Sequence, residues 1–266
     1  MISIILPIFN NEKTIQRTLN SIIKNLTIND ELIIINDGST DSSLSIIKNF
    51  IKDNKNLETK IITNKKQMGL AFSLNEAISL AEKKYIARID GDDININNRF
   101  EFQLKVMEEN PQIDLLTCTK IDYKTTKDID KINFKLSKKS IYKLKRISKY
   151  ILAYKNLIVH PSIICKTEVI KKFKYNIKFI KSQDYKLWLD MIISGIKIYS
   201  CDRAVIMYFN NPINKIKIKK QLFFSIKARI DYVNLYRPLL SLILLIGSIK
   251  DKIKIYKLNL FNKNEI

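Results

Sequence analysis

Three aspartates close together in the sequence are the residues best suited to chemistry in this chain. Asp90, Asp92 and Asp93 follow the apolar stretch 85–89, and a single glycine separates the first two. Carboxylates this close repel one another and raise each other's pKa unless a cation lies among them. In an extended segment, Asp90 and Asp92 can point to the same side and offer the hard oxygen ligands that Mg²⁺ or Mn²⁺ prefers. A divalent metal site and an acidic turn after a strand are both open interpretations.

The chain before this loop alternates between predicted strands and helices. The predicted strands are short apolar or β-branched runs at residues 2–6, 31–35, 59–63 and 85–89. Between them, apolar residues recur at helical spacing. This alternation predicts an α/β fold with a mostly parallel central sheet and helices on both faces. Ligands bind beyond the carboxyl ends of such strands, so the loops 7–10, 36–41 and 90–93 are expected to converge on one site.

The pattern is less regular after the acidic loop. A helix is expected over residues 99–109, and strands over residues 115–119, 157–165, 196–200 and 204–208. Residues 122–149 are rich in Lys, Asp and Ser, which predicts a solvated excursion next to the acceptor, with one helix near residues 140–153. A further apolar helix is expected over residues 185–193, ended by Gly195.

Composition limits the classes to which the protein can belong. Its 266 residues are 46% apolar, which suits one large domain with a packed core. The formal net charge of +21 comes mostly from lysine, in a chain rich in Ile and Asn, as an A+T-rich coding bias would produce. That bias and a basic surface for anionic membranes or other polyanions are equally open explanations. No zinc-finger, basic-zipper or recognition-helix pattern accompanies the charge, which argues against a nucleic-acid partner.

Cysteine usage and the N-terminus both indicate a cytoplasmic protein. Cys118, Cys165 and Cys201 are odd in number and widely spaced, so neither a disulfide framework nor a zinc site is predicted. The N-terminus enters an apolar run without a basic leader or a cleavage pattern, which argues against secretion.

Residues 211–266 differ in character and are predicted to form a helical extension of a domain spanning residues 1–210. Residues 213–236 are basic and helix-like, Pro238 breaks this stretch, and residues 239–246 are almost wholly apolar. The apolar run is too short to span a bilayer. Two interpretations stay open: it lies on the inner face of the cell membrane, with neighbouring lysines on anionic lipid, or it packs on the preceding domain.

Six stretches of the chain carry a family resemblance. In order across roughly residues 1–200, they read SIILPIFNNEKTI, ELIIINDGSTDSS, GLAFSLNEAI, YIARIDGDDININNRFEFQ, HPSII and QDYKLWL. Taken together at this spacing, they resemble the family 2 glycosyltransferases of the GT-A fold. Within that family, they are similar to bacterial enzymes that extend lipooligosaccharide, capsule or O-antigen chains. The resemblance implies a UDP-sugar donor and a divalent metal cofactor, Mn²⁺ or Mg²⁺.

The resemblance assigns the nucleotide contacts to the first two loops. Pro7, Phe9 and Asn10 match the loop that holds the uracil, and an aromatic ring such as that of Phe9 can stack on a planar base. Asp37 matches the carboxylate that accepts the N3–H of uracil. Turn and helix-cap chemistry is the alternative for residues 37–41.

The acidic loop matches the DxD pair of the family. Asp92 is assigned to the metal and the diphosphate, and Asp90 to the ribose or to the outer shell of the metal. Asp93 either contacts the donor sugar or caps the next helix. Arg88 or Arg99 pairs with Asp90 or with phosphate, and a structural ion pair is the expected role of Arg99. His160 either lies near the diphosphate or is a packed loop residue. A metal held by so few carboxylates keeps coordination positions free for a diphosphate.

Asp184 is the candidate catalytic base. Inverting sugar transfer needs a carboxylate that removes the proton of the acceptor hydroxyl while that oxygen attacks the anomeric carbon. The family places this carboxylate in an acidic pair before a helix. Gln183 and Asp184 match that pair, with Gln183 in place of the usual Glu. A helix N-cap is the alternative role of Asp184.

The predicted function is inverting transfer of a hexose or N-acetylhexosamine from a UDP-sugar to a saccharide acceptor. The expected acceptor is lipid-linked and belongs to surface polysaccharide or lipooligosaccharide synthesis, and an anionic membrane surface is a second expected partner. The alternative is a peripheral membrane or polyanion-binding protein with an inactive transferase-like domain, which the departure at Gln183 keeps open. A sugar nucleotidyltransferase would need a glycine- and arginine-rich N-terminal signature, which the stretch PIFNNEKTI lacks.

Overall fold

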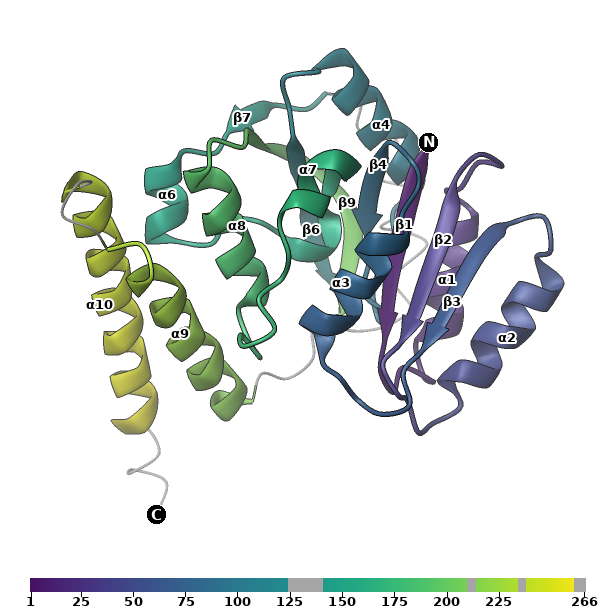
Figure 1. Cartoon of the computed structure of the whole chain (residues 1–266), viewed down its shortest axis with the longest axis horizontal. Helices are drawn as coiled ribbons and strands as arrows, with labels where there is room; N and C mark the ends of the chain where they lie inside the picture. Colours follow the sequence, from purple (N-terminus) through teal and green to yellow (C-terminus); the bar gives the residue numbers. More distant parts are fainter. Residues whose placement is uncertain (124–140, 210–213, 234–237, 261–266) are drawn as a thin grey trace. The chain divides into compact units, whose positions relative to one another are not determined.

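The computed structural model describes residues 1–123, 141–209, 214–233 and 238–260 (Figure 1). The chain forms two compact units. Unit 1 consists of Met1–Arg146, Ile158–Lys174 and Lys197–Asn210. Unit 2 consists of Ile147–Leu157, Tyr175–Ile196 and Asn211–Ile266. Each unit therefore combines segments that are far apart in the sequence, and the expected division of the sequence at residue 210 stays a prediction.

The first half of unit 1 is a parallel sheet with helices between its strands. The strands are β1 (Ile2–Ile8), β2 (Glu31–Asn36), β3 (Glu58–Thr63) and β4 (Tyr85–Arg88). The helices between them are α1 (Ile15–Ile23), α2 (Ser43–Asp53) and α3 (Leu70–Leu80). The strand order is β3-β2-β1-β4, and each pair is parallel. The predicted alternation is confirmed, and the carboxyl ends of these strands lie at one edge of the sheet.

The second half of unit 1 adds strands of both directions. β8 (Ile164–Lys166) is antiparallel to β4 and to β6 (Leu115–Tyr123), and β9 (Ile198–Phe209) is parallel to β6. The short strands β5 (Ile94–Asn95) and β7 (Leu144–Arg146) pair antiparallel with β9. The helical segments are α4 (Arg99–Glu109), η2 (His160–Ser162) and α7 (Thr167–Lys172). The sheet is therefore mixed, and the expected parallel arrangement holds for its N-terminal strands.

The core of unit 1 forms on both faces of the sheet. Every residue of β1 and β2 is buried, as expected for parallel strands covered on both sides. On one face, Ile4 and Leu6 of β1 belong to the same apolar cluster as Ile15 and Leu19 of α1. On the other face, α3 packs against β1 and β2. This two-sided burial fixes the strand ends from which the polar loops leave.

The described part of unit 2 is helical (Figure 1). Its helices are α6 (Lys149–Tyr154), α8 (Gln183–Ile193), α9 (Lys215–Ile230) and α10 (Pro238–Leu260). Leu240 and Leu244 of α10 form an apolar cluster with Ala153 of α6, bordered by Ile193 and Tyr232. Among the residues that the structure describes, none forms a helix with both the length and the apolar character needed to cross a membrane.

The segment that leads into α6 differs from its prediction. The helix expected over residues 140–153 is shorter, because β7 occupies residues 144–146 and α6 begins at Lys149. β7 pairs with Tyr199–Cys201 of β9, so a tertiary pairing overrides the local pattern. The excursion expected over residues 122–149 falls partly on residues 124–140, outside the described residues.

Candidate functional site

Hydroxyl groups of α1 and of its N-cap residue, Thr14, hold the acidic loop that follows β4. Thr18 Oγ1 lies 3.1 Å from the carbonyl oxygen of Gly91 and 2.8 Å from that of Asp93. Thr14 Oγ1 donates to the Gly91 carbonyl at 2.7 Å. Gly91 lets the loop pack closely on its neighbours, since a Cβ atom there would lie 2.7 Å from Ile8 Cδ1 and displace that side chain. The loop backbone is therefore held against the end of β1 and the start of α1. These contacts fix the positions from which the loop carboxylates extend.

The carboxylates of this loop form the expected cluster. Oxygen atoms of Asp90, Asp92 and Asp93 lie within 4.8 Å of one another, close enough to share one metal ion. Asp90 pairs with Nη2 of Arg88, whereas Asp93 is fully buried. Burial and the charge of Asp90 raise the pKa of Asp92, against the opposing charges of Arg17 and Arg88. A divalent cation would relieve this repulsion, so the oxygen donors fit Mn²⁺ or Mg²⁺.

Asp93 occupies a different position from the other two carboxylates. It is fully buried, and its backbone N–H donates to the Asp90 carbonyl at 3.1 Å. The alternative that Asp93 caps the next helix is wrong, because α4 has Asn98 as its N-cap and β5 intervenes. Its contact with the donor sugar stays a prediction.

Arg88 places a buried cation beside the carboxylates. Its Nε and Nη1 atoms make no hydrogen bond within the described residues, although the side chain is almost fully enclosed. His160 lies in η2 and is buried, and burial together with the charge of Arg88 lowers its pKa. Burial and the nearby Arg88 charge therefore both favour the neutral form of His160.

Arg99 joins the elements around the acidic loop. Its Nη1 donates to Asn95 Oδ1 at 2.7 Å, its Nη2 to the Arg88 carbonyl at 2.8 Å and its Nε to Gln103 Oε1 at 2.9 Å. Gln103 Nε2 in turn donates to the carbonyl of Ser162 at 2.8 Å. Burial lowers the pKa of the Arg99 guanidinium, and hydrogen bonds to oxygen atoms compensate for its lost hydration. Arg99 therefore positions β4, β5, α4 and η2 relative to one another.

The expected nucleotide residues lie at the end of β1, beside the loop after β2. Pro7 belongs to β1, and Phe9 is 39% exposed just beyond that strand. Asn10 has a left-handed backbone (φ 52°), and its N–H donates to Ser39 Oγ at 3.0 Å. Its Oδ1 accepts a hydrogen bond from the N–H of Thr40 at 2.9 Å. The structure therefore brings the two predicted loops together and leaves the aromatic ring of Phe9 accessible.

Asp37 is buried and holds the loop between β3 and α3. Its Oδ1 accepts hydrogen bonds from Asn64 Nδ2 at 3.0 Å and from the N–H of Met68 at 2.9 Å. Its Oδ2 accepts from the N–H of Gly69 at 2.9 Å. A carboxylate offers about four acceptor positions, so these bonds leave room for one more donor. The loop role of Asp37 is established by these contacts, and its contact with uracil stays a prediction.

Two residues that the sequence did not mark also contact the acidic loop. The Arg17 Nη2 atom, at 3.4 Å, and the Tyr123 hydroxyl, at 3.3 Å, both donate to the carbonyl of Asp92. Burial raises the pKa of Tyr123 to about 12. Tyr123 comes from a distant strand and has no local signal. Arg17 lies on α1, three residues after Thr14, and its contact with a loop 75 residues away depends on tertiary packing.

Asp184 belongs to unit 2. It is the second residue of α8, whose N-cap is Ser182, so the alternative that Asp184 caps this helix is wrong. Its Oδ2 lies 3.4 Å from Asn156 Nδ2, and the side chain is half-buried. Tyr185 and Trp188 of the same helix are buried and anchor it. The aspartates of the acidic loop belong to unit 1, so their grouping with Asp184 in one site stays a prediction.

Comparisons with other sequences agree on one family. Residues 3–173 match the family model described as Glycosyl transferase family 2. An uncharacterized glycosyltransferase of Methanocaldococcus jannaschii is 34% identical over 230 residues, covering 85% of this chain and 77% of the relative. An Escherichia coli UDP-Glc:alpha-D-GlcNAc-diphosphoundecaprenol beta-1,3-glucosyltransferase is 27% identical over 230 residues, covering 83% of each protein.

Solved structures share the fold. The S. aureus TarS 1–349 structure in complex with UDP-GlcNAc matches with a TM-score of 0.69 at 17% identity, covering 91% of this chain and 70% of that chain. The mannosyltransferase PcManGT from Pyrobaculum calidifontis, in complex with GDP-Man and Mn²⁺, matches with a TM-score of 0.68 at 13% identity, covering 93% of this chain and 68% of that chain. The expected GT-A fold is thereby confirmed.

Proposed function

Because the chain belongs to glycosyl transferase family 2, we propose that it transfers a hexose or N-acetylhexosamine from a UDP-sugar to a saccharide acceptor. The observation that carries this proposal is the acidic loop, whose carboxylate oxygens lie within 4.8 Å of one another. The loop lies at the carboxyl edge of parallel strands, where α/β folds bind nucleotides. TarS, which shares the fold, binds UDP and UDP-GlcNAc, and the E. coli relative uses UDP-Glc.

The residues of unit 1 are proposed to bind the donor. Asp92, with Asp90 beside it, would hold a divalent ion, which offsets negative charge on the diphosphate when bound. Arg88 supplies a second positive group, and its N–H groups without a partner in the described residues favour this role. Phe9 would stack on the uracil, and the remaining acceptor position of Asp37 would take the N3–H.

Asp184 is the proposed general base. Its carboxylate removes the proton of the acceptor hydroxyl while that oxygen forms a bond to the anomeric carbon. The bond from the anomeric carbon to the UDP oxygen breaks in the same displacement, and UDP leaves with the electron pair. The configuration inverts, and no covalent sugar–enzyme intermediate forms. Asp184 lies in the first turn of α8, and negatively charged side chains are favourable at the N-terminal end of a helix.

The acceptor is proposed to be a lipid-linked saccharide of surface polysaccharide synthesis. The E. coli relative acts, by its name, on GlcNAc-diphosphoundecaprenol. A substrate of this kind would confine the reaction to a membrane surface. The protein would then work on the cytoplasmic face, with its basic C-terminal helices attached peripherally.

A donor screen tests the proposal. Purified protein with UDP-sugars, MnCl₂ and a lipid-linked oligosaccharide should release UDP and lengthen the acceptor by one sugar, as measured by mass spectrometry. Asp184→Asn should lower turnover by at least about a hundredfold, because it removes the base. Asp190→Asn is the matched control on the same helix, since Asp190 pairs with Lys186 at 2.7 Å. Near-normal turnover by Asp184→Asn would refute the base assignment.

Gln183 is the residue that favours a second function. It stands where the resemblance leads one to expect Glu, and that change could remove a group needed for activity. Salt-sensitive binding to anionic lipid, with no UDP released from any donor, would support a polyanion-binding protein with an inactive transferase-like domain. Metal-dependent UDP release with a suitable acceptor would eliminate that function.

A further inference from the structure

α10 has one face packed within unit 2 and an opposite face that is exposed and apolar. The buried residues Leu240, Leu244, Ser248 and Asp251 recur at the spacing of one helix side. The exposed apolar residues of the other side are Leu239, Leu242, Leu245, Ile246, Ile249, Ile253 and Tyr256. We call these seven residues the outer face; their exposed fractions run from 42% to 63%. A water-facing helix side normally carries polar residues, so an apolar outer face indicates a partner.

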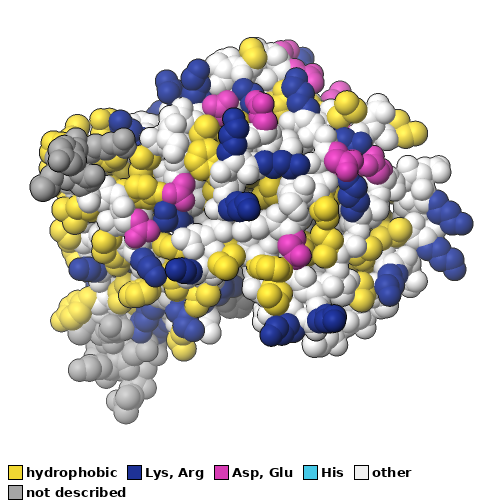
Figure 2. Space-filling model, in the orientation of Figure 1, with side chains coloured by type: hydrophobic (Ala, Val, Ile, Leu, Met, Phe, Trp, Pro, Cys, Tyr) yellow, Lys and Arg dark blue, Asp and Glu magenta, His cyan; other side chains and the backbone are white. Residues whose placement is uncertain are grey.

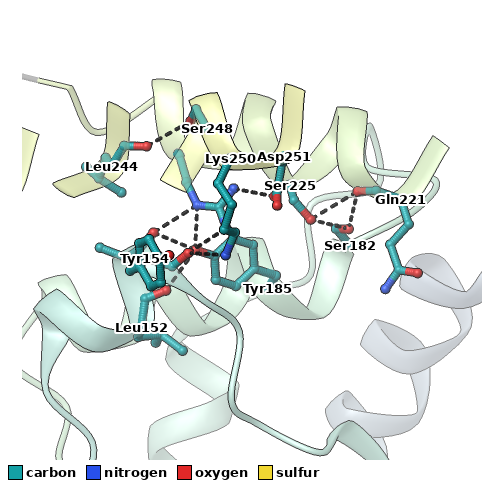
Figure 3. Close-up of polar contacts among 12 residues, drawn as sticks. Leu152, Tyr154, Ser182, Tyr185, Gln221, Ser225, Leu244, Ser248, Lys250 and Asp251 are labelled. Carbon is teal, nitrogen blue, oxygen red and sulfur yellow. Dashed lines mark hydrogen bonds and ion pairs between the residues drawn. The ribbon is translucent and has the colours of Figure 1, made fainter. Parts of the chain in front are cut away.

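A buried polar network fixes which side of α10 points inward. Arg229 of α9 is buried, and its Nη1 pairs with Asp251 of α10 at 2.7 Å. Its Nε lies 2.8 Å from the Ala153 carbonyl and 3.0 Å from the Tyr185 hydroxyl. Its Nη2 donates to the Tyr154 carbonyl at 3.2 Å. Figure 3 shows Asp251, Tyr154 and Tyr185 in this network, which joins α6, α8, α9 and α10.

Close packing at Gly247 reinforces this orientation. A Cβ atom at Gly247 would lie 3.0 Å from both Arg229 Nε and the Tyr154 carbonyl. Turning α10 to bury Leu242 would separate Arg229 from Asp251 and leave two buried charges without partners, which is strongly unfavourable. The packing of the helix within unit 2 therefore keeps the outer face exposed.

Basic residues border the outer face, and no acidic residue of α10 lies on it. Lys252 and Lys257 are exposed and, at about 3.6 residues per turn, lie on opposite sides of the outer face. Asp251 is the only acidic residue in the sequence of α10, and it is buried against Arg229. Figure 2 shows hydrophobic side chains gathered over α10, with Lys and Arg side chains next to them. The surface thus combines apolar contact area with positive charge.

α9 repeats this combination. Its exposed apolar residues Ile216, Phe223 and Ile230 follow one another at seven-residue intervals, so they lie on one side of the helix. Lys220 and Lys227 of the same helix are exposed. Two helices that pack against each other therefore both expose apolar residues among lysines.

We propose that the outer face of α10 lies in the interfacial layer of an anionic lipid bilayer, with its apolar side chains among the acyl chains and the flanking lysines at the headgroups. The inference deepens the peripheral attachment given with the proposed function and rests on it. An apolar helix side bordered by lysines binds anionic bilayers in the plane of the interface. A second copy of this chain suits the outer face less, because it would bring one basic surface against another.

Vesicle sedimentation tests the proposal without donor, metal or acceptor, so its failure is distinct from a failure of sugar transfer. The full chain should pellet with vesicles of phosphatidylcholine and phosphatidylglycerol, and stay in solution with pure phosphatidylcholine. The triple variant L242Q/I246Q/I249Q should bind at least about tenfold more weakly. I28Q/I61Q/L80Q is the matched control, since these residues are exposed in unit 1. Unchanged binding by the outer-face variant would overturn the proposal.

Charge substitutions test the role of the lysines that border the outer face. K252Q/K254Q/K257Q should weaken binding to phosphatidylglycerol vesicles by roughly a hundredfold, at about fivefold for each lysine. K48Q/K52Q/K55Q changes the net charge equally through exposed lysines in and just after α2 and should have little effect. Equal weakening by both triples would overturn the assignment to α10. A second result would also overturn it: the unmodified chain forms a dimer in light scattering, L242Q/I246Q/I249Q disrupts that dimer, and neither protein binds vesicles.

Discussion

Two groups of carboxylates lie at opposite edges of the sheet of unit 1, and their surroundings distinguish them. The glutamate cluster is Glu31, Glu58 and Glu82, near the amino ends of β2, β3 and β4. The aspartate cluster is Asp90, Asp92 and Asp93, beyond the carboxyl end of β4. In each cluster, the oxygen atoms lie within 4.8 Å of one another, so distance alone would make both of them metal sites.

Lysines neutralise the glutamate cluster. Lys60 lies 2.9 Å from Glu31 and 2.8 Å from Glu82, and Lys83 lies 2.7 Å from Glu58. Burial raises the pKa of Glu31, but hydrogen bonds from hydroxyl, backbone and ammonium groups outweigh burial and lower it. The cluster is therefore a closed set of ion pairs that holds the strand ends together.

The aspartate cluster retains its electrostatic repulsion. Asp90 pairs with Arg88, yet the pKa of Asp92 is raised, because burial and the charge of Asp90 outweigh the nearby arginines. The comparison teaches that the spacing of carboxylates does not by itself mark a metal site. The cations already in contact with them decide whether the site still gains from a metal.

The largest expected effect is the loss of a carboxylate from the aspartate cluster. Asp92→Asn should lower kcat/KM by roughly a thousandfold, because it removes a proposed metal ligand. A titration with Mn²⁺, monitored by electron paramagnetic resonance, should show that Asp92→Asn binds the ion much more weakly than the unmodified protein does. Glu58→Gln is the matched change in the glutamate cluster and should keep both properties. If Glu58→Gln weakened Mn²⁺ binding as much as Asp92→Asn, the distinction between the clusters would fail.

A smaller effect is expected when the support of the aspartate loop is removed. Thr18→Val deletes the hydroxyl that lies 2.8 Å from the Asp93 carbonyl. We expect Mn²⁺ to bind about ten- to a hundredfold more weakly, measured by calorimetry, because the loop would hold its ligands less firmly. Thr59→Val is the control, since that hydroxyl donates to the Leu57 carbonyl at 3.3 Å near the start of β3. Unaltered Mn²⁺ affinity in Thr18→Val would show that the hydroxyl does not position the ligands.

The binding of Mn²⁺ should also depend on pH in a way that reports Asp92. A protonated carboxyl binds metal poorly, and the pKa of Asp92 is raised in the folded protein. The affinity should therefore fall as pH decreases, over a range above the ordinary aspartate pKa of about 4. Asp90→Asn removes the repelling charge and should move this fall to lower pH. A wild-type fall centred at or below the ordinary value would contradict the assignment.

The smallest expected effect concerns the glutamate cluster and appears in stability. Glu31→Gln should lower the free energy of unfolding at pH 7 by about 1–3 kcal/mol, measured with urea, because it removes a buried charge that accepts hydrogen bonds. The folded-state pKa of Glu31 is lowered, so its stabilisation is present above the unfolded-state pKa and is lost as pH falls through the folded-state value. In Glu31→Gln, the free energy of unfolding should therefore lack the decrease at low pH that titration of Glu31 causes in the unmodified protein. Glu82→Gln, at an exposed site, should change stability by less than about 1 kcal/mol.

Much of the first half of unit 1 could be predicted from local pattern. Parallel strands buried on both faces need apolar runs, and amphipathic helices must lie between them, so the order of elements through β4 follows from the sequence. The pairing of Arg88 with Asp90 was one of the alternatives that the sequence left open, and the structure shows it.

The remaining contacts depend on residues that are distant in the sequence. Asp37 receives its hydrogen bonds from the loop after β3, and no local pattern gives its carboxylate those partners. β7 forms because β9 offers it a free edge, although the sequence around residues 140–153 favours a helix. The outer face of α10 is exposed because Arg229 binds Asp251 on the opposite side.

The sequence by itself determined the family, the alternating strands and helices, and the loop that carries the aspartate cluster, because these depend on residue types over short stretches. The tertiary structure decided which carboxylates are neutralised and which side of α10 meets the solvent. Both outcomes depend on the cations that folding brings near a given carboxylate, and the order of residues along the chain does not encode that proximity directly.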